Sequence, residues 1–300
     1  MSNTNAKSGI VYGISAYLIW GFLPIYWKFL ENIDSGAVLA HRIIWSFVFM
    51  IGFILITKRW TLFTQQCKAI LNNKKVLITI TMASLIISLN WLVFIWAVQN
   101  GYVVQSSLGY YINPLISVLF AIVFLRERLS ALQLFSFVLA GIGVIYLTVD
   151  YGVFPWVSLM LAVTFASYGL LKKVANVDAT FGLAIETLIV TPIALIYLLF
   201  TFGPGMGFQT TSTSEILLLI CSGAATAIPL LLFGIAVTTM PLSVVGFLQY
   251  IAPTIMLFIG VFLYKESFTQ AHAITFTFIW ISLILYMYSS LKKQRKKRMS

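Results

Sequence analysis

Ten long apolar runs constrain the fold more than any other feature of this sequence. A helix needs roughly 20 mainly apolar residues to cross a bilayer core about 30 Å thick. Runs of about that length, bounded by charged residues, prolines, glycines or polar clusters, cover residues 9–30, 36–57, 76–98, 101–125, 131–149, 153–172, 180–201, 214–238, 241–264 and 270–291. The sequence therefore predicts an all-α polytopic membrane protein with ten transmembrane helices.

The composition also favours lipid as the solvent. Hydrophobic residues make up 60% of the chain and charged residues only 9%, whereas a soluble domain carries roughly 25% charged residues. A soluble fold of this size cannot hide so much apolar surface. The first run follows Lys7, is long enough to span and lacks a small-residue cleavage site, so we expect a first helix rather than a cleavable signal peptide.

The basic residues orient the spans. With the N-terminus in the cytoplasm, sixteen of the nineteen Lys and Arg residues fall on the cytoplasmic side, as the positive-inside rule requires. The exceptions are Lys28 and Lys265, which fall outside, and Arg42, which lies within a span. We expect a bacterial cytoplasmic membrane protein with both termini in the cytoplasm and a basic tail, residues 292–300, that is attracted to anionic headgroups. The net charge of +11 is spread between and after the spans, which excludes nucleic acid as a partner.

The two halves of the chain, residues 1–149 and 150–291, share a spacing of residues. A Tyr-Ile-x-Pro motif and a following glutamate recur at an offset of 139, as Tyr111, Ile112, Pro114 and Glu127 and as Tyr250, Ile251, Pro253 and Glu266. At an offset of 144, Asp34, Ala40 and Arg42 match Asp178, Ala184 and Glu186. Because each half would contain five spans, an odd number, the second half would enter the membrane upside down. Two inverted five-helix repeats are typical of transporters that rock around a midplane site.

Motifs along nearly the whole chain carry a family resemblance. They are Ala40-His41-Arg42, Asn90-Trp91, residues 95–98, residues 107–115, Glu127-Arg128-Leu129, Pro241-Leu242-Ser243 and residues 248–254. In these motifs the chain resembles the RarD branch of the EamA family, within the drug/metabolite transporter superfamily. The resemblance implies a ten-helix fold of two inverted repeats around a central cavity, and a permease that is usually discussed as an exporter of metabolites or drugs.

Three charged or imidazole side chains lie well inside the predicted spans, away from the span ends, where a charge costs roughly 2.5–3.5 kcal/mol at the helix centre. Arg42 could hold an anionic or zwitterionic cargo through its planar fork of donors, or snorkel to the outer interface. Glu186 could couple transport to protons, or accept static hydrogen bonds that support helix packing. His41 could titrate near neutral pH or serve in packing. A direct pair between Arg42 and Glu186 is disfavoured because inversion separates their depths by about 12 Å.

Neutral amides and aromatic rings are further candidates for the lining of a cavity. The candidates are Asn90, Asn113 and Gln249, and the rings of Trp20, Trp91, Tyr111, Tyr168 and Tyr250. Pro114 and Pro253 are expected helix breaks, because each proline frees a backbone carbonyl four residues earlier. The alternative roles are hydrogen bonds between helices for the amides and lipid packing for the rings.

The function that these features favour is secondary transport of a small metabolite or drug-like molecule by alternating access. The expected partners are that molecule, membrane lipids and, for a coupled carrier, protons; no feature assigns an oligomeric state. The alternatives are an intramembrane lipid-modifying enzyme, a channel, and a non-transporting receptor or structural membrane protein. An enzyme is disfavoured because only His41 and His272 are histidines and no nucleophile motif appears. Neither metal nor cofactor is expected, because Cys67 and Cys221 show no paired or ligand spacing.

Overall fold

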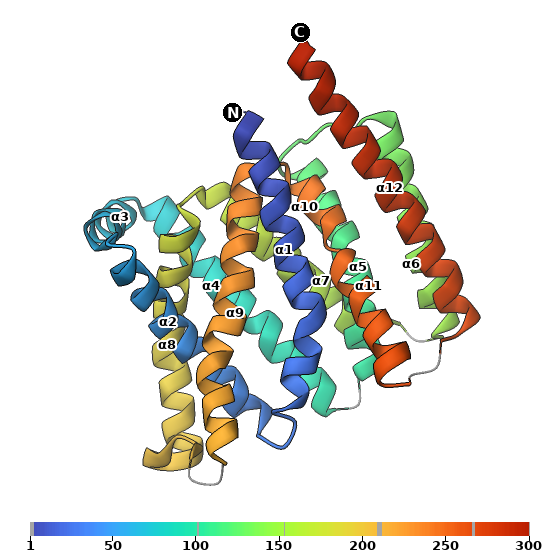
Figure 1. The fold of residues 1–300 in the computed structure, drawn as a ribbon. Helices are drawn as coiled ribbons and strands as arrows, with labels where there is room; N and C mark the ends of the chain where they lie inside the picture. The colour runs from blue at the N-terminus through green and yellow to red at the C-terminus, as the bar shows by residue number, and fades with distance from the viewer. Residues whose placement is uncertain (1–2, 101, 153, 209–211, 266–267, 300) are drawn as a thin grey trace.

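The computed structural model describes residues 3–100, 102–152, 154–208, 212–265 and 268–299, and within these ranges the chain is helical (Figure 1). The helices are α1 (Asn3–Lys28), α2 (Ser35–Ile56), α3 (Trp60–Asn72), α4 (Lys74–Gln99), α5 (Val103–Val123), α6 (Ala131–Asp150), α7 (Trp156–Ala175), α8 (Ala179–Phe202), α9 (Thr213–Thr239), α10 (Leu242–Leu248), α11 (Ile251–Phe258) and α12 (Gln270–Met299). A short 3-10 turn, η1 (Gly203–Gly205), follows α8, and a π-helical turn, η3 (Ile259–Leu263), follows α11.

Ten helical segments in the described part of the chain are long and apolar enough to cross a membrane. They correspond one to one with the ten apolar runs, and the predicted all-α fold class with ten spans is confirmed. Both chain ends lie at the same end of the bundle (Figure 1). We call this end the terminal end, and the other the distal end.

Two aspartates begin helices at opposite ends of the bundle. The Asp34 carboxylate accepts a hydrogen bond from the Ala37 amide at the start of α2, at 2.9 Å. Asp178 accepts from the amides of Thr180 and Phe181 at the start of α8, at 2.9 and 3.3 Å. An aspartate at this position satisfies amides that have no partner in the first helical turn. The caps therefore fix where α2 and α8 start.

Helices distant in sequence pack in pairs. The main pairs are α1 with α9 and α11, α2 with α8 and α9, α4 with α7 and α8, α5 with α7 and α10, and α6 with α12. Figure 1 shows α6 and α12 side by side at one edge of the bundle. Glycine permits the closest approach, because a Cβ at Gly223 of α9 would collide with the backbone carbonyl of Trp45 on α2.

The ninth span is divided into segments. α10 ends at Leu248, α11 begins at Ile251, and Gln249 and Tyr250 form the turn between them. Pro253 lacks the amide that would bond to the Gln249 carbonyl in a continuous helix. α5, by contrast, continues through Pro114, so the expected break there is a correction. A proline removes one hydrogen bond, and the neighbouring helices of a membrane bundle can hold such a helix together.

One helix, α3, has no counterpart among the predicted spans. It is amphipathic, with Phe63 and Ile70 buried against the bundle. With only 13 residues it is too short to span, since crossing takes roughly 20. It links the terminal ends of α2 and α4, and in Figure 1 it is seen nearly end-on beside the spans.

Candidate functional site

A small cavity lies among α2, α4, α7, α8 and α9, with a volume of about 20 Å³. This volume is about that of one water molecule. The lining residues are the hydroxyl side chains of Ser46, Ser84, Ser88 and Thr187, the aliphatic side chains of Ile43, Ile87, Leu183, Val190 and Leu230, and Trp91, Tyr168 and Glu186. The cavity therefore contains a carboxylate in a mostly apolar and hydroxyl-lined interior.

The Glu186 carboxylate is held by two groups on α7. Lys172 Nζ donates to Oε1 at 2.7 Å and the Tyr168 hydroxyl donates to Oε2 at 2.9 Å. Tyr168 and Lys172 are four residues apart, which places them on one face of the helix. Gly234 on α9 leaves room for the lysine, because a Cβ there would lie 3.1 Å from Lys172 Cε. Each carboxylate oxygen of Glu186 therefore has a donor.

The structure gives Lys172 a partner that the sequence interpretation lacked. The charge count used it only as a cytoplasmic residue at the end of the span 153–172, and the structure places it in the last turn of α7 with its side chain directed to Glu186. A lysine at a span end is usually interpreted in this way, because its long stem snorkels to water. The signal that could have revealed the pair was the four-residue spacing from Tyr168 to Lys172 on the helix that faces Glu186.

Arg42 lies near the cavity but does not bind Glu186. Its Nε donates to Thr226 Oγ1 of α9 at 3.1 Å, and its guanidinium carbon lies 4.4 Å from the ring centre of Trp27 and 5.3 Å from that of Trp91. Trp91 also lines the cavity, so one ring contacts both the cavity and the cation. Arginine on aromatic faces is stabilised by the ring quadrupole.

His41 lies outside the cavity. One ring nitrogen, Nε2, is 2.9 Å from the Met206 carbonyl, and the imidazole centre lies 4.5 Å from the Phe208 ring. His41 therefore fastens α2 to the segment that follows η1.

Several predicted cavity residues instead join helices. Asn90 Nδ2 donates to the Leu161 carbonyl at 2.9 Å and to Thr164 Oγ1 at 2.8 Å, which connects α4 to α7. Trp20 packs against Phe233 at 5.7 Å between ring centres, and Phe233 stacks on Tyr168 at 5.9 Å. The two hydrogen bonds of Asn90 support the packing alternative for this residue. Trp20 belongs to an aromatic cluster that includes Tyr168, one of the two donors to Glu186.

A second polar group lies between α5 and α10. Gln249 Nε2 donates to Ser117 Oγ at 2.9 Å, and Asn113 lies one helical turn before Ser117 on α5. In the described structure, Asn113 Oδ1, Gln249 Oε1 and the Tyr250 hydroxyl are buried without a hydrogen-bond partner. Buried polar atoms of this kind are rare because their desolvation is costly. Tyr111 lies on the same helix with its ring edge-on to Phe276, 5.4 Å away between centres.

At the terminal end of the bundle, Glu127, which follows α5, binds the start of α10. Its carboxylate accepts from the Leu242 amide at 2.7 Å, from the Ser243 amide at 3.1 Å and from the Ser243 hydroxyl. Lys173 Nζ donates to the neighbouring Met240 carbonyl at 2.7 Å. The repeated motif drew attention to Glu127, but sequence spacing gave no sign of its partner. These contacts join the first half of the chain to the second at the terminal end.

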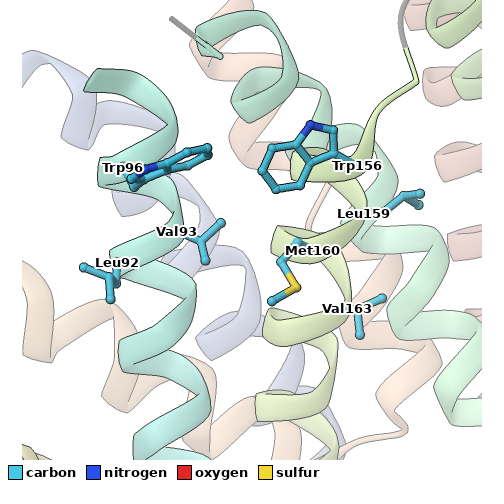
Figure 2. Close-up of a pocket in the computed structure, with 7 residues that line it drawn as sticks. All are labelled: Leu92, Val93, Trp96, Trp156, Leu159, Met160 and Val163. Carbon is cyan, nitrogen blue, oxygen red and sulfur yellow. The ribbon is translucent and has the colours of Figure 1, made fainter. Parts of the chain in front are cut away.

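A separate apolar groove opens on the side of the bundle between α4 and α7, with a volume of about 690 Å³. Figure 2 shows Trp96 and Trp156 at one end of it, with Leu92, Val93, Leu159, Met160 and Val163 along its walls. None of these residues lines the central cavity. In the described part of the chain, no group of three or more His, Cys, Asp or Glu side chains could hold a metal ion.

Comparison with known proteins decides the family. The model described as the EamA-like transporter family matches residues 7–149. The chain is 44% identical to the uncharacterized transporter YojE of Bacillus subtilis (strain 168) over 298 residues, which is 99% of each chain. It is 35% identical to the protein RarD of Escherichia coli (strain K12) over 304 residues, again 99% of each. The chain is a RarD-like member of the EamA family.

This RarD-like chain is therefore a membrane transporter of the drug/metabolite transporter superfamily, embedded in a bacterial membrane. It is 29% identical to the chloramphenicol-sensitive protein RarD of Pseudomonas aeruginosa over 293 residues, or 96% of each chain. A solved crystal structure superimposes with a TM-score of 0.71 at 16% identity and covers 94% of this chain and 97% of the other. That likeness shows the fold alone.

Proposed function

We propose that this protein is a secondary transporter that exports a small metabolite or drug-like molecule across the cytoplasmic membrane by alternating access. The observation that carries the proposal is the small cavity that Glu186 lines. Its walls come from α2 and α4 in residues 1–149 and from α7, α8 and α9 in residues 150–291. A site enclosed by both halves of one chain is what a rocking transporter needs.

The pairing of the helices supports two equivalent halves. Exchanging the first five spans for the last five converts the pair α1–α9 into α7–α4, the pair α5–α7 into α11–α1, and the pair α4–α8 into α9–α2, and all six pairs are in contact. The pairs α2–α8, α5–α10 and α6–α12 convert into themselves. This is the pattern expected of a pseudo-two-fold axis that relates two five-helix units.

The two capping aspartates support the same symmetry. Asp34, before α2, lies 3.4 Å from the Tyr197 hydroxyl near the end of α8. Asp178, before α8, lies 3.1 Å from Arg59 just after α2. Asp34 at the distal end and Asp178 at the terminal end therefore each cap one helix of the α2–α8 pair and contact a residue in or next to the other helix. This arrangement is the one expected of an inverted repeat.

Glu186 is our candidate for proton coupling. Its carboxylate is buried and accepts hydrogen bonds from the Lys172 ammonium and the Tyr168 hydroxyl. A proton on Glu186 would leave Lys172 without its counter-charge, so protonation and the ion pair exclude one another. Proton binding would therefore loosen the contact between α7 and α8.

Arg42 is our candidate for recognition of the cargo. Its guanidinium supplies a positive charge and planar donors, and the Trp91 ring that it contacts also lines the cavity. An anionic or zwitterionic molecule with a planar part fits this combination.

The test is a cargo screen on purified protein in liposomes, with and without a proton gradient. We expect a cargo whose flux exceeds that of empty liposomes and responds to the gradient. Glu186→Gln should abolish the response to the gradient, while Glu215→Gln, which changes a partly exposed carboxylate at the start of α9, should keep it. An unchanged response in Glu186→Gln would refute coupling through this residue, and no flux for any cargo class would refute transport.

A further inference from the structure

The short helix α3 exposes apolar side chains that the bundle does not cover. Phe63 and Ile70 face inward, but Trp60 and Leu71 are 44% and 65% exposed. Trp60 and Leu71 are eleven residues apart, close to three helical turns, so they share one side of α3. Exposed large apolar side chains on a helix that is too short to span are typical of a helix that lies in the membrane interface.

The four lysines around α3 are not balanced by acidic residues in the same stretch of chain. Lys58 and Arg59 precede the helix, Lys68 lies on it, and Lys74 and Lys75 follow it. No Asp or Glu occurs between Asp34 and Glu127. All four lysines are exposed. The surface is therefore positively charged and complementary to an anionic partner.

The location of α3 indicates which anionic partner it meets. The helix joins α2 to α4 at their terminal ends and lies crosswise to the spans (Figure 1). The ends of spans lie at the level of the lipid headgroups. A soluble acidic protein would match the lysines, but it would not account for apolar rings at headgroup level.

Contacts with the bundle hold α3 in this orientation. Arg59 pairs with Asp178 at 3.1 Å, and its guanidinium carbon lies 4.5 Å from the ring centre of Phe181. Phe63 packs on the same Phe181 ring, 5.9 Å between centres. Since Asp178 and Phe181 belong to the start of α8, α3 is fixed to the helix that carries Glu186.

From these observations we infer that α3 and its flanking lysines form a binding surface for anionic lipid headgroups. Trp60 and Leu71 enter the boundary between headgroups and acyl chains, while the lysines bind the lipid phosphates. This surface is distinct from the basic tail and does not depend on the proposed transport cycle.

The test uses full-length protein in liposomes of neutral phosphatidylcholine, with and without phosphatidylglycerol, whose acyl chains are brominated near the headgroup. Bromine quenches tryptophan fluorescence on contact, and subtracting the signal of Trp60→Phe isolates Trp60. We expect quenching of Trp60 that increases with phosphatidylglycerol. Lys68→Gln/Lys75→Gln should remove about half of that increase or more, since each lysine near the surface contributes to anionic-lipid attraction.

The matched control is Lys292→Gln/Lys293→Gln, which removes the same charge from the tail and should leave the increase intact. Every variant should unfold at the wild-type temperature, because the altered lysines are exposed or belong to the tail. Unquenched Trp60 in both lipids would overturn the inference, since α3 would then face water or another protein. An equal loss of the phosphatidylglycerol-dependent quenching in the tail variant would also overturn the inference. The attraction to anionic lipid would then depend on the total positive charge rather than on the lysines around α3.

Discussion

The Lys172 ammonium lies 2.7 Å from a Glu186 carboxylate oxygen, and the two side chains are 5% and 6% exposed. The pair joins α7 to α8 beside the central cavity. Removing one partner of a buried pair leaves an uncompensated charge, whereas removing both does not. The pair is therefore a side-chain bridge that fixes the position of α7 relative to α8, as well as a candidate for coupling.

We predict that Lys172→Met lowers the free energy of unfolding by about 3–5 kcal/mol, because Glu186 would stay buried without a cation. Adding Glu186→Gln to that variant should restore part of the loss. Unfolding in detergent measures both effects. The comparison is Arg59→Met, which breaks a pair whose side chains are 35% and 38% exposed and should cost about 1 kcal/mol or less. Equal losses in Lys172→Met and Arg59→Met would contradict the prediction.

We predict that Gly223→Ala destabilises the protein by about 1–3 kcal/mol, because the new methyl group would collide with the Trp45 backbone where α9 meets α2. Gly52→Ala is the control, since a Cβ at Gly52 has nothing within 4 Å. Thermal unfolding in detergent should show a lower midpoint for Gly223→Ala alone. If the two variants have the same midpoint of thermal unfolding, the close approach of α2 and α9 is not present.

We predict that Glu127→Ala weakens the contact between the two halves of the chain at the terminal end. The carboxylate accepts hydrogen bonds from two amides and a hydroxyl at the start of α10, and losing such a cap typically costs about 1 kcal/mol or more. Hydrogen exchange should increase in residues 240–248. Glu215→Ala removes a comparable cap at the start of α9, at the distal end, and should leave exchange in residues 240–248 at the wild-type rate. If residues 240–248 exchange as slowly in Glu127→Ala as in the wild type, other contacts hold the start of α10 in place.

We predict that Arg42→Lys weakens the binding of anionic cargo by about tenfold, or roughly 1.4 kcal/mol, because lysine lacks the planar fork that rests on Trp27 and Trp91. Binding of candidate cargoes to purified protein measures the effect. Thr226→Val removes the hydroxyl that accepts from Arg42 and should have a smaller effect, since the charge remains. The proposed recognition of cargo by Arg42 is wrong if Arg42→Ala impairs folding but leaves the affinity for anionic cargo unchanged.

The spans were predictable because bilayer thickness sets a length that the apolar runs must meet. α3 was missed for the same reason: its 13 residues are too few to register in a search for spans of about 20. Its amphipathic pattern, with Phe63 and Ile70 on one face, was the available signal.

The site was less predictable than the fold, because partners depend on which helix faces which. Glu186 was singled out because a carboxylate in a span needs a partner, yet that partner, Lys172, lies at a span end where lysine usually reaches water. Trp27 and Thr226, the contacts of Arg42, come from helices whose packing no local pattern specifies. Asn90 and His41 were predicted to line a cavity. In the structure each side chain bonds to a backbone carbonyl of another segment, which supports their alternative role in packing.

The most direct measurement of alternating access is the reactivity of a thiol in the cavity. Ser84 lines the cavity and is fully buried, so Ser84→Cys in a Cys67→Ser/Cys221→Ser background should react only when the cavity opens. We expect a membrane-impermeant thiol reagent to modify it from either side of the membrane. Adding Glu127→Ala should speed the reaction from the terminal side and slow it from the distal side, because it shifts the population toward one state. Reaction from one side only, or a faster reaction from the terminal side with no slowing from the distal side, would contradict the account.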